Sequence, residues 1–245
     1  MTTWPATMWI VRHGESAGNV ARDAAHASGA DRIELSARDV DIPLSPLGKE
    51  QASALGNWFA AQRPSERPEL ILSSPYVRAQ DTARTIAAAL GDLPLRIDER
   101  LREKEFGILD GLTTQGVAAL QPDQAEFRRL LGKFYHRPPG GESWCDVVFR
   151  LRSILDTIAL HHGGRRVLIV AHQVVVLCLR YVIEELSEAE ILAIDREGDV
   201  ANCSVTEYRT DPGGQPRLVG YNVTAPLAGE AAVTTETAEP KGVRG

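Results

Sequence analysis

The sequence predicts an α/β fold in three layers, in which a mostly parallel central sheet carries helices on both faces and a cap is inserted at one edge. Two observations lead to this prediction. Short apolar runs alternate along the chain with segments whose apolar residues recur at helical spacing, and this alternation is typical of βαβ units in a parallel sheet. One long stretch, residues 100–142, interrupts the alternation, and we interpret it as a cap within a single domain rather than as a second domain.

The first half of the chain alternates regularly. The apolar run 8–11 is typical of a short buried strand. The polar residues 29–43 predict an irregular segment, which we expect to pass over the functional site described below. Ser45 and Pro46 suit the N-cap and the first position of a helix. In order, the expected elements are a strand at 8–11, a helix at 15–28, a helix at 44–62, a strand at 68–74, a helix at 76–90 and a strand at 94–98.

The second half begins with the proposed cap, where glycines at three positions between 100 and 122 indicate loops. A domain spanning residues 1–223 is expected, followed by a mobile tail at 224–245, which has low complexity and no aromatic residue. In order, the expected elements are a helix at 123–134, a long amphipathic helix at 143–162, a strand at 165–172, a helix at 173–186 and a terminal hairpin at 202–209 and 216–222.

The composition is that of an ordinary globular protein and narrows the classes of partner. The chain has 245 residues, of which 43% are hydrophobic and 24% charged, so it can bury a sizeable core. A formal net charge of −6 argues against nucleic acid or an anionic membrane as the main partner. No run approaches the length of a transmembrane helix, and the N-terminus lacks the features of a signal peptide, so we expect a cytoplasmic protein. Three widely spaced cysteines favour neither a disulfide framework nor a cysteine-based zinc site.

Charged and imidazole side chains follow the predicted strands at the points where these strands end. Arg12 and His13 follow the first strand, Arg78 lies in the first turn of the helix after the second, Glu103 comes just beyond the third, and His172 follows the run "VLIVA". The carboxyl ends of parallel strands lie along one edge of a sheet, where α/β proteins place their ligand crevice. We therefore expect these five side chains to converge.

Two arginines, two histidines and helix N-termini around one crevice are typical of a phosphate site. Arginine matches phosphate oxygens with paired N–H groups, and a helix N-terminus adds backbone donors and a partial positive charge. One histidine can attack phosphorus, while a carboxylate can protonate the leaving group. Phosphoryl transfer depends mainly on positioning and on stabilisation of charge, and this set of residues offers both.

The ordered set of motifs resembles the histidine phosphatase superfamily, which includes the cofactor-dependent phosphoglycerate mutases. The match begins at Arg12-His13-Gly14-Glu15 and extends over roughly residues 8–210. Corresponding segments follow in the same order, each near a predicted strand or turn: "PLSPLGKEQA", "LSSPYVRAQDTA", "LREKEFGILDGL", "PPGGES" and "VLIVAHQ". The resemblance implies a phosphoglycerate mutase-like fold.

The resemblance also implies a role for each matching residue. His13 would be the phosphorylated nucleophile, and Glu103 the general acid and base, although Glu103 could instead belong to a merely charged run. Arg12, Arg78 and His172 would hold the phosphoryl group. Neither a metal nor another cofactor is implied, and the sequence contains no metal-binding or Walker motif.

Four further residues are candidates for contacts with substrate. Ser16 and Asn19 match positions that line the family's phosphate pocket. Gln173 departs from the family, which usually has glycine after its second histidine, and either narrows the pocket or makes a contact of its own. Lys104 stands where the mutases have an arginine for the substrate carboxylate.

Three functions stay open, and the sequence favours a phosphatase acting on a small phosphorylated metabolite. Phe106 stands where the mutases have a tyrosine, and their short segment after the first helix is replaced by residues 29–43. Both departures argue against a cofactor-dependent phosphoglycerate mutase-type phosphotransferase, which is the main alternative. A non-catalytic protein that binds a phosphorylated ligand is the third reading. The oligomeric state is not predicted.

Overall fold

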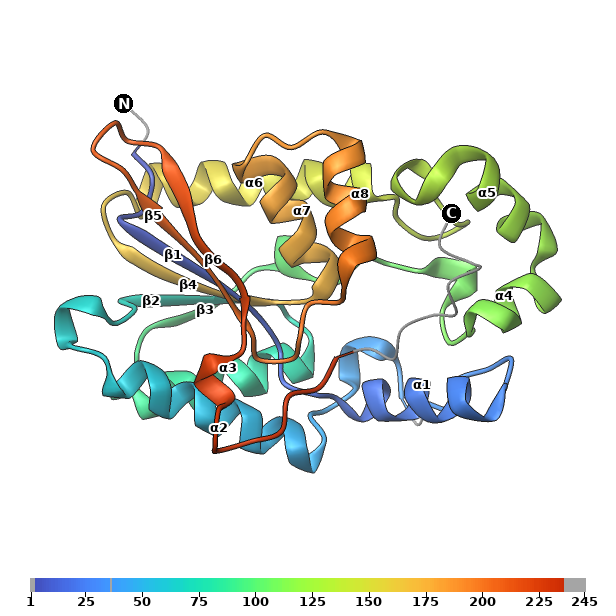
Figure 1. Cartoon of the computed structure of the whole chain (residues 1–245), viewed down its shortest axis with the longest axis horizontal. Coiled ribbons are helices and arrows are strands. Elements are labelled where there is room, and N and C mark those ends of the chain that lie inside the picture. The colour runs from blue at the N-terminus through green and yellow to red at the C-terminus, as the bar shows by residue number, and fades with distance from the viewer. Residues whose placement is uncertain (1–2, 36, 236–245) are drawn as a thin grey trace.

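The computed structural model describes residues 3–35 and 37–235, and within them a six-stranded sheet has the order β3-β2-β4-β1-β5-β6 (Figure 1). The strands β3, β2, β4 and β1 are parallel to one another. At the other edge, β5 pairs antiparallel with β1, and β6 pairs antiparallel with β5. The predicted α/β architecture with a mostly parallel sheet is therefore confirmed. The strands are β1 (Thr7–Arg12), β2 (Leu70–Ser73), β3 (Leu95–Ile97), β4 (Arg166–Ala171), β5 (Val205–Thr210) and β6 (Pro216–Val223).

Helices cover both faces of this sheet. The helices α6 and α7 pack on one face, and α2 and α3 pack on the other (Figure 1). Figure 1 also shows α1, α4 and α5 beyond the carboxyl ends of the parallel strands. The helices are α1 (Ala17–Ser28), α2 (Pro46–Ala61), α3 (Val77–Ala89), α4 (Thr114–Leu120), α5 (Pro122–Tyr135), α6 (Trp144–His161), α7 (Gln173–Ile183) and α8 (Glu188–Glu197).

The alternation of side chains along β1 explains why the central strands are apolar throughout. Met8 and Ile10 pack in the core cluster of α6 and α7, whereas Trp9 and Val11 pack in the cluster of α2 and α3. Successive side chains of a strand point to opposite faces, so a strand between two helical layers has no polar position. The apolar run therefore ends only at Arg12, where the site begins.

Two helices were not among the expected elements. Helix α4 lies in the stretch that was expected to be loops, and α8 follows α7 directly. A capping box begins α8, because Ser187 accepts from the backbone N–H of Glu190 while the Glu190 carboxylate accepts from that of Ser187. This S-x-x-E pattern is a local signal that could have predicted the helix.

The first part of the expected tail, residues 224–235, packs against the domain. Leu227 is completely buried and packs in the cluster of α2 and α3. The side-chain amide of Gln51 donates to the carbonyl of Ala232 (2.8 Å), and the backbone N–H of Asn202 donates to that of Thr234 (2.9 Å). One buried leucine and a few backbone hydrogen bonds fix a segment whose average composition indicates mobility. The rest of the expected tail, residues 236–245, lies outside the described residues.

None of the described helices combines the length and the apolar character that crossing a membrane requires.

Candidate active site

Four of the five predicted strand-end residues form one buried cluster. Arg12 ends β1 and His13 follows it, Arg78 is the second residue of α3, and His172 is the N-cap of α7. The rings of His13 and His172 have centroids 5.0 Å apart, and Arg78 hydrogen-bonds to His13. All four residues are at most 5% exposed. The parallel topology thus brings them together as expected.

The two ring nitrogens of His13 have different partners, and these partners fix its tautomer. Nδ1 lies 2.7 Å from the carbonyl oxygen of Gly14, which can only accept, so Nδ1 carries the proton. Nε2 receives a hydrogen bond from the Nε–H of Arg78 at 3.2 Å, so Nε2 carries the lone pair. Burial, and then the charges of Arg78 and Arg12, hold the pKa of His13 well below its ordinary value. A neutral imidazole that carries its lone pair on Nε2 is the form that can attack phosphorus.

The loop that carries His13 is held by several hydrogen bonds. The backbone N–H of Gly14 donates to Oγ1 of Thr82 (3.1 Å), and the Asn202 side chain donates to the carbonyl of His13 (3.0 Å). A Cβ on Gly14 would lie 2.5 Å from the carbonyl oxygen of Gly48, so only glycine permits this close approach to α2. Sequence reasoning missed Thr82 and Asn202, because neither belongs to a local motif that indicates the contact.

His172 lies between a hydroxyl and an aromatic ring. Its Nε2 is 2.7 Å from Oγ of Ser74, and its ring is 4.9 Å from that of Tyr76, measured between centroids. Its Nδ1 is buried and has no hydrogen-bond partner among the described residues. Burial, followed by the charge of Arg78, lowers the pKa of His172 well below its ordinary value. His172 is therefore neutral near pH 7 and can offer an N–H to an incoming oxygen.

Both arginines are held by protein oxygens. Nη1 of Arg12 donates to Oε1 of Gln173 (3.0 Å) and to the carbonyl of Val200 (2.5 Å). Gln173 in turn donates to Asp199 (3.0 Å), so the residue that departs from the family pattern orients Arg12. Arg78 makes a two-pronged ion pair with the carboxylate of Asp39, a residue that sequence reasoning did not single out.

Ser16 and Asn19 form the capping box of α1. Oγ of Ser16 accepts from the backbone N–H of Asn19 (3.1 Å), and Oδ1 of Asn19 accepts from the backbone N–H of Ser16 (2.9 Å). The structure thus gives both side chains a part in starting a helix beside His13. Their contact with substrate stays a prediction.

Glu103 and Lys104 lie in the segment between β3 and α5. A carboxylate oxygen of Glu103 accepts from the backbone N–H of Lys104 (2.8 Å). Burial raises the pKa of Tyr76, and the charge of Glu103 is one of the smaller causes acting in the same direction. The carboxylate of Glu103 is therefore within electrostatic range of Tyr76, whose ring lies beside His172. Burial and the nearby Arg128 lower the pKa of Lys104 to about 8, and its Nζ lies 4.5 Å from the ring centre of Phe106.

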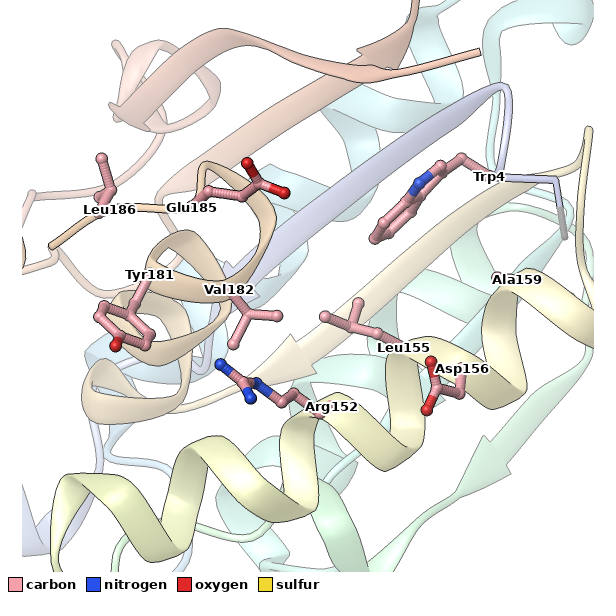
Figure 2. A pocket seen from close by; sticks show the side chains of 9 residues that line it. All are labelled: Trp4, Arg152, Leu155, Asp156, Ala159, Tyr181, Val182, Glu185 and Leu186. Carbon is pink, nitrogen blue, oxygen red and sulfur yellow. The ribbon is translucent and has the colours of Figure 1, made fainter.

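A separate cavity lies on the outer side of α6 and α7. It has a volume of about 560 Å³ and is lined by Trp4 together with residues of both helices and of the turn after α7 (Figure 2). None of the predicted site residues lines it. Within the described part of the chain, no group of three or more histidine, cysteine, aspartate or glutamate side chains could hold a metal ion.

A family model decides the assignment that the motifs and the geometry suggest. The model described as the histidine phosphatase superfamily (branch 1) matches residues 8–224. The chain belongs to this branch of the histidine phosphatase superfamily. The resemblance inferred from the sequence is therefore confirmed.

Relatives of this chain include longer proteins. A bifunctional protein of Mycobacterium tuberculosis is 35% identical over 176 residues, which cover 72% of this chain and 46% of that protein. The chain thus spans less than half the length of this relative. A probable phosphoglycerate mutase of Yersinia enterocolitica, GpmB, is 29% identical over 209 residues, which cover 84% of this chain and 86% of that protein.

Among solved structures, the mycobacterial glucosyl-3-phosphoglycerate phosphatase is similar to this chain over nearly its whole length. The two share 27% sequence identity and superpose with a TM-score of 0.68, over 89% of this chain and 99% of the other. The phosphoglycerate mutase-like fold is therefore confirmed over nearly the whole chain, and a phosphatase is among its close structural neighbours.

Proposed function

We propose that this member of the histidine phosphatase superfamily is a metal-independent phosphomonoester hydrolase that forms a phosphohistidine on Nε2 of His13. The observation that carries the proposal is the state of His13, which is neutral, hydrogen-bonded through Nδ1 to the carbonyl of Gly14, and carries on Nε2 a lone pair that faces Arg78. The similarity to a mycobacterial phosphatase supports hydrolysis as the outcome.

The first chemical step transfers the phosphoryl group to the protein. Nε2 of His13 attacks phosphorus, and the bond between phosphorus and the ester oxygen breaks. Glu103 supplies the proton that this oxygen takes up. Arg12, Arg78 and His172 donate hydrogen bonds to the phosphoryl oxygens, whose negative charge they stabilise in the transition state.

The second step returns the protein to its starting state. Glu103, now ionised, takes a proton from water, and the resulting oxygen attacks the phosphorus of phosphohistidine. The P–N bond breaks, Nε2 regains its lone pair, and inorganic phosphate leaves. Glu103 thus acts as acid and then as base.

The substrate class that fits is a small phosphorylated metabolite. The four basic side chains of the cluster (Arg12, His13, Arg78 and His172) are at most 5% exposed, and such covered sites suit small molecules. The segment 100–142, which carries Glu103, α4 and α5, would form the cap over this site. Residues within this segment would then select the group attached to phosphate.

One observation favours a phosphotransferase as the second candidate. Lys104 is buried beside Arg128, and a buried lysine near a second cation can bind the carboxylate of a phosphorylated acid. A relative named as a probable phosphoglycerate mutase adds support. In that case phosphohistidine would return its phosphoryl group to a second substrate oxygen instead of to water.

A substrate panel tests the proposal. The purified protein is incubated, with EDTA, with sugar phosphates, phosphoglycerates, nucleotides and p-nitrophenyl phosphate, and both released phosphate and isomerised product are measured. We expect EDTA-resistant phosphate release that His13→Ala abolishes. Isomerisation of 3-phosphoglycerate stimulated by 2,3-bisphosphoglycerate would establish a mutase instead, and binding of phosphate without any turnover would identify a non-catalytic binding protein.

A further inference from the structure

Arg78 joins the nucleophile to a carboxylate from a distant loop. Its Nε–H donates to Nε2 of His13 at 3.2 Å. Its Nη1 donates to both the carbonyl (2.6 Å) and Oδ1 (3.0 Å) of Asp39, and Nη2 donates to Oδ2 (3.1 Å). Asp39 begins a short 3₁₀ helix, Asp39–Asp41, in the polar stretch that follows α1.

The carboxylate of Asp39 occupies the groups that a phosphoryl group needs. Arginine binds a carboxylate and a phosphate with the same planar pair of N–H groups, and on Arg78 this pair is directed at Asp39. The Arg78 side chain is 7% exposed, whereas that of Asp39 is 34% exposed. Asp39 thus covers the binding edge of Arg78 and itself faces solvent.

The same contact also restrains the nucleophile. A phosphorus atom bonded to Nε2 of His13 would take the position that the Nε–H of Arg78 now holds at 3.2 Å. Arg78 must therefore move away from His13 before attack, and its two-pronged bond to Asp39 opposes this movement. When Asp39 leaves Arg78, both His13 and Arg78 become accessible to a phosphoryl group.

We propose that Asp39 competes with the phosphoryl group for Arg78 and so weakens the binding of both substrate and inorganic phosphate. This inference rests on the proposed function, since it assumes that a phosphoryl group binds at Arg78. Displacement of Asp39 is the same step for every anion that uses Arg78, so it reduces all their affinities by one factor. When the product phosphate departs, Asp39 returns to Arg78, and this return limits inhibition by the product.

The opposite role for Asp39 makes the opposite prediction. If Asp39 stayed on Arg78 throughout and only positioned it, then loss of the carboxylate would let Arg78 drift and phosphate would bind more weakly. The sign of the change in phosphate affinity therefore separates a competitor from a positioning residue.

Asp39→Asn is the main test, because it keeps the shape of the side chain and removes the charge that Arg78 attracts. We expect the inhibition constant of inorganic phosphate and the KM for p-nitrophenyl phosphate both to fall by about tenfold, with no rise in kcat. The asparagine amide could still accept a hydrogen bond from Arg78 through its oxygen, so a second variant is needed. Asp39→Ser has a side chain too short to reach the guanidinium and should lower both constants at least as much.

Asp41→Asn is the matched control. Asp41 lies in the same 3₁₀ helix but pairs with the exposed Arg38 at 2.8 Å, so its loss should leave both constants within about twofold. Unchanged or weaker phosphate binding in both Asp39 variants, with turnover intact, would overturn the inference and leave the hydrolase proposal standing.

Calorimetric titration with inorganic phosphate separates the two proposals, because it needs no turnover. Tighter binding by Asp39→Asn in a protein that hydrolyses no ester would support the competition and refute the hydrolase. Failure of phosphate to bind either the parent protein or the variants would overturn the inference, since Arg78 would then not be a phosphate ligand.

Discussion

Replacing Glu142 by glutamine should destabilise the protein by about 2–3 kcal/mol, because Glu142 is the centre of a nearly buried ion-pair network. Its carboxylate accepts from Nε (2.9 Å) and Nη2 (3.0 Å) of Arg150, from Arg102 (3.3 Å) and from the backbone N–H of Glu105 (3.0 Å). The side chains of Glu142 and Arg150 are 11% and 12% exposed. Removing one partner of a fully buried pair costs about 3–5 kcal/mol, and glutamine keeps one oxygen as an acceptor, which reduces the loss.

Denaturation by urea, followed by circular dichroism, measures this loss directly. The matched control is Glu126→Gln, which breaks a pair with Arg129 whose side chains are 53% and 67% exposed, and exposed pairs contribute at most about 1 kcal/mol. If the two variants lost the same stability, the network around Glu142 would not be worth more than a surface pair, and the reasoning would be refuted.

The pH dependence of the difference gives a second check. Burial raises the pKa of Glu142, but the hydrogen bond and charge of Arg150 outweigh it, so the pKa lies below its ordinary value. A carboxyl group with a lowered pKa stabilises the folded state above its unfolded pKa, and this contribution disappears as the pH falls through the lowered value. The difference between the parent protein and Glu142→Gln should thus be constant from about pH 8 to 6 and shrink below about pH 4.5.

Four further changes test the site and its supports. Glu103→Gln should slow the step that protonates the leaving group by about 10²–10⁴-fold, and steady-state kinetics should show a smaller loss with p-nitrophenyl phosphate, whose leaving group needs less protonation. Leu227→Ala should cost about 2–4 kcal/mol in thermal or urea unfolding, because this side chain is completely buried; a loss under about 0.5 kcal/mol would mean that residues 224–235 are not packed. Asn202→Ala should cost about 0.5–1.5 kcal/mol by the same assay and lower kcat, since the buried carbonyl of His13 then keeps only the longer hydrogen bond, from the backbone N–H of Cys203 (3.3 Å). Because burial lowers the pKa of His13, kcat/KM corrected for substrate ionisation should not fall between pH 8 and 6.5, and a loss there with an apparent pKa near 6.5 would contradict a neutral, buried nucleophile.

The sequence was sufficient to predict the cluster of basic side chains, because each member follows an apolar strand. The carboxyl ends of parallel strands lie along one edge of a sheet, so the topology brings these side chains together. Arg78 illustrates this: its place two residues into α3 follows from the strand before it. Asp39 could not be predicted in the same way. It lies in an irregular stretch, and its contact with Arg78 depends on the path of a loop that no periodicity describes.

The C-terminal segment shows a second limit of sequence reasoning. Low complexity is a property of the average composition of a segment. The position of residues 224–235 depends instead on the single buried side chain of Leu227 and on the backbone carbonyls of Ala232 and Thr234, which accept hydrogen bonds. The capping box of α8 is the contrary case, since its two partners are three residues apart and could have been read locally. Contacts within one turn are visible in a sequence, and contacts across the fold are visible only where the topology is regular.

The hydrogen bonds that hold the backbone of His13 also have a consequence for folding during translation. A ribosome synthesises Arg12 and His13 early, yet the backbone N–H of His13 donates to Ala171, its carbonyl accepts from Asn202, and Asn202 is itself held by Thr234. The hydrogen bonds that hold His13 can therefore form only after Ala171, Asn202 and Thr234 have been synthesised. Contacts between such distant parts of a chain form slowly, so the nascent chain must be protected from aggregation until Asn202 and Thr234 are in place.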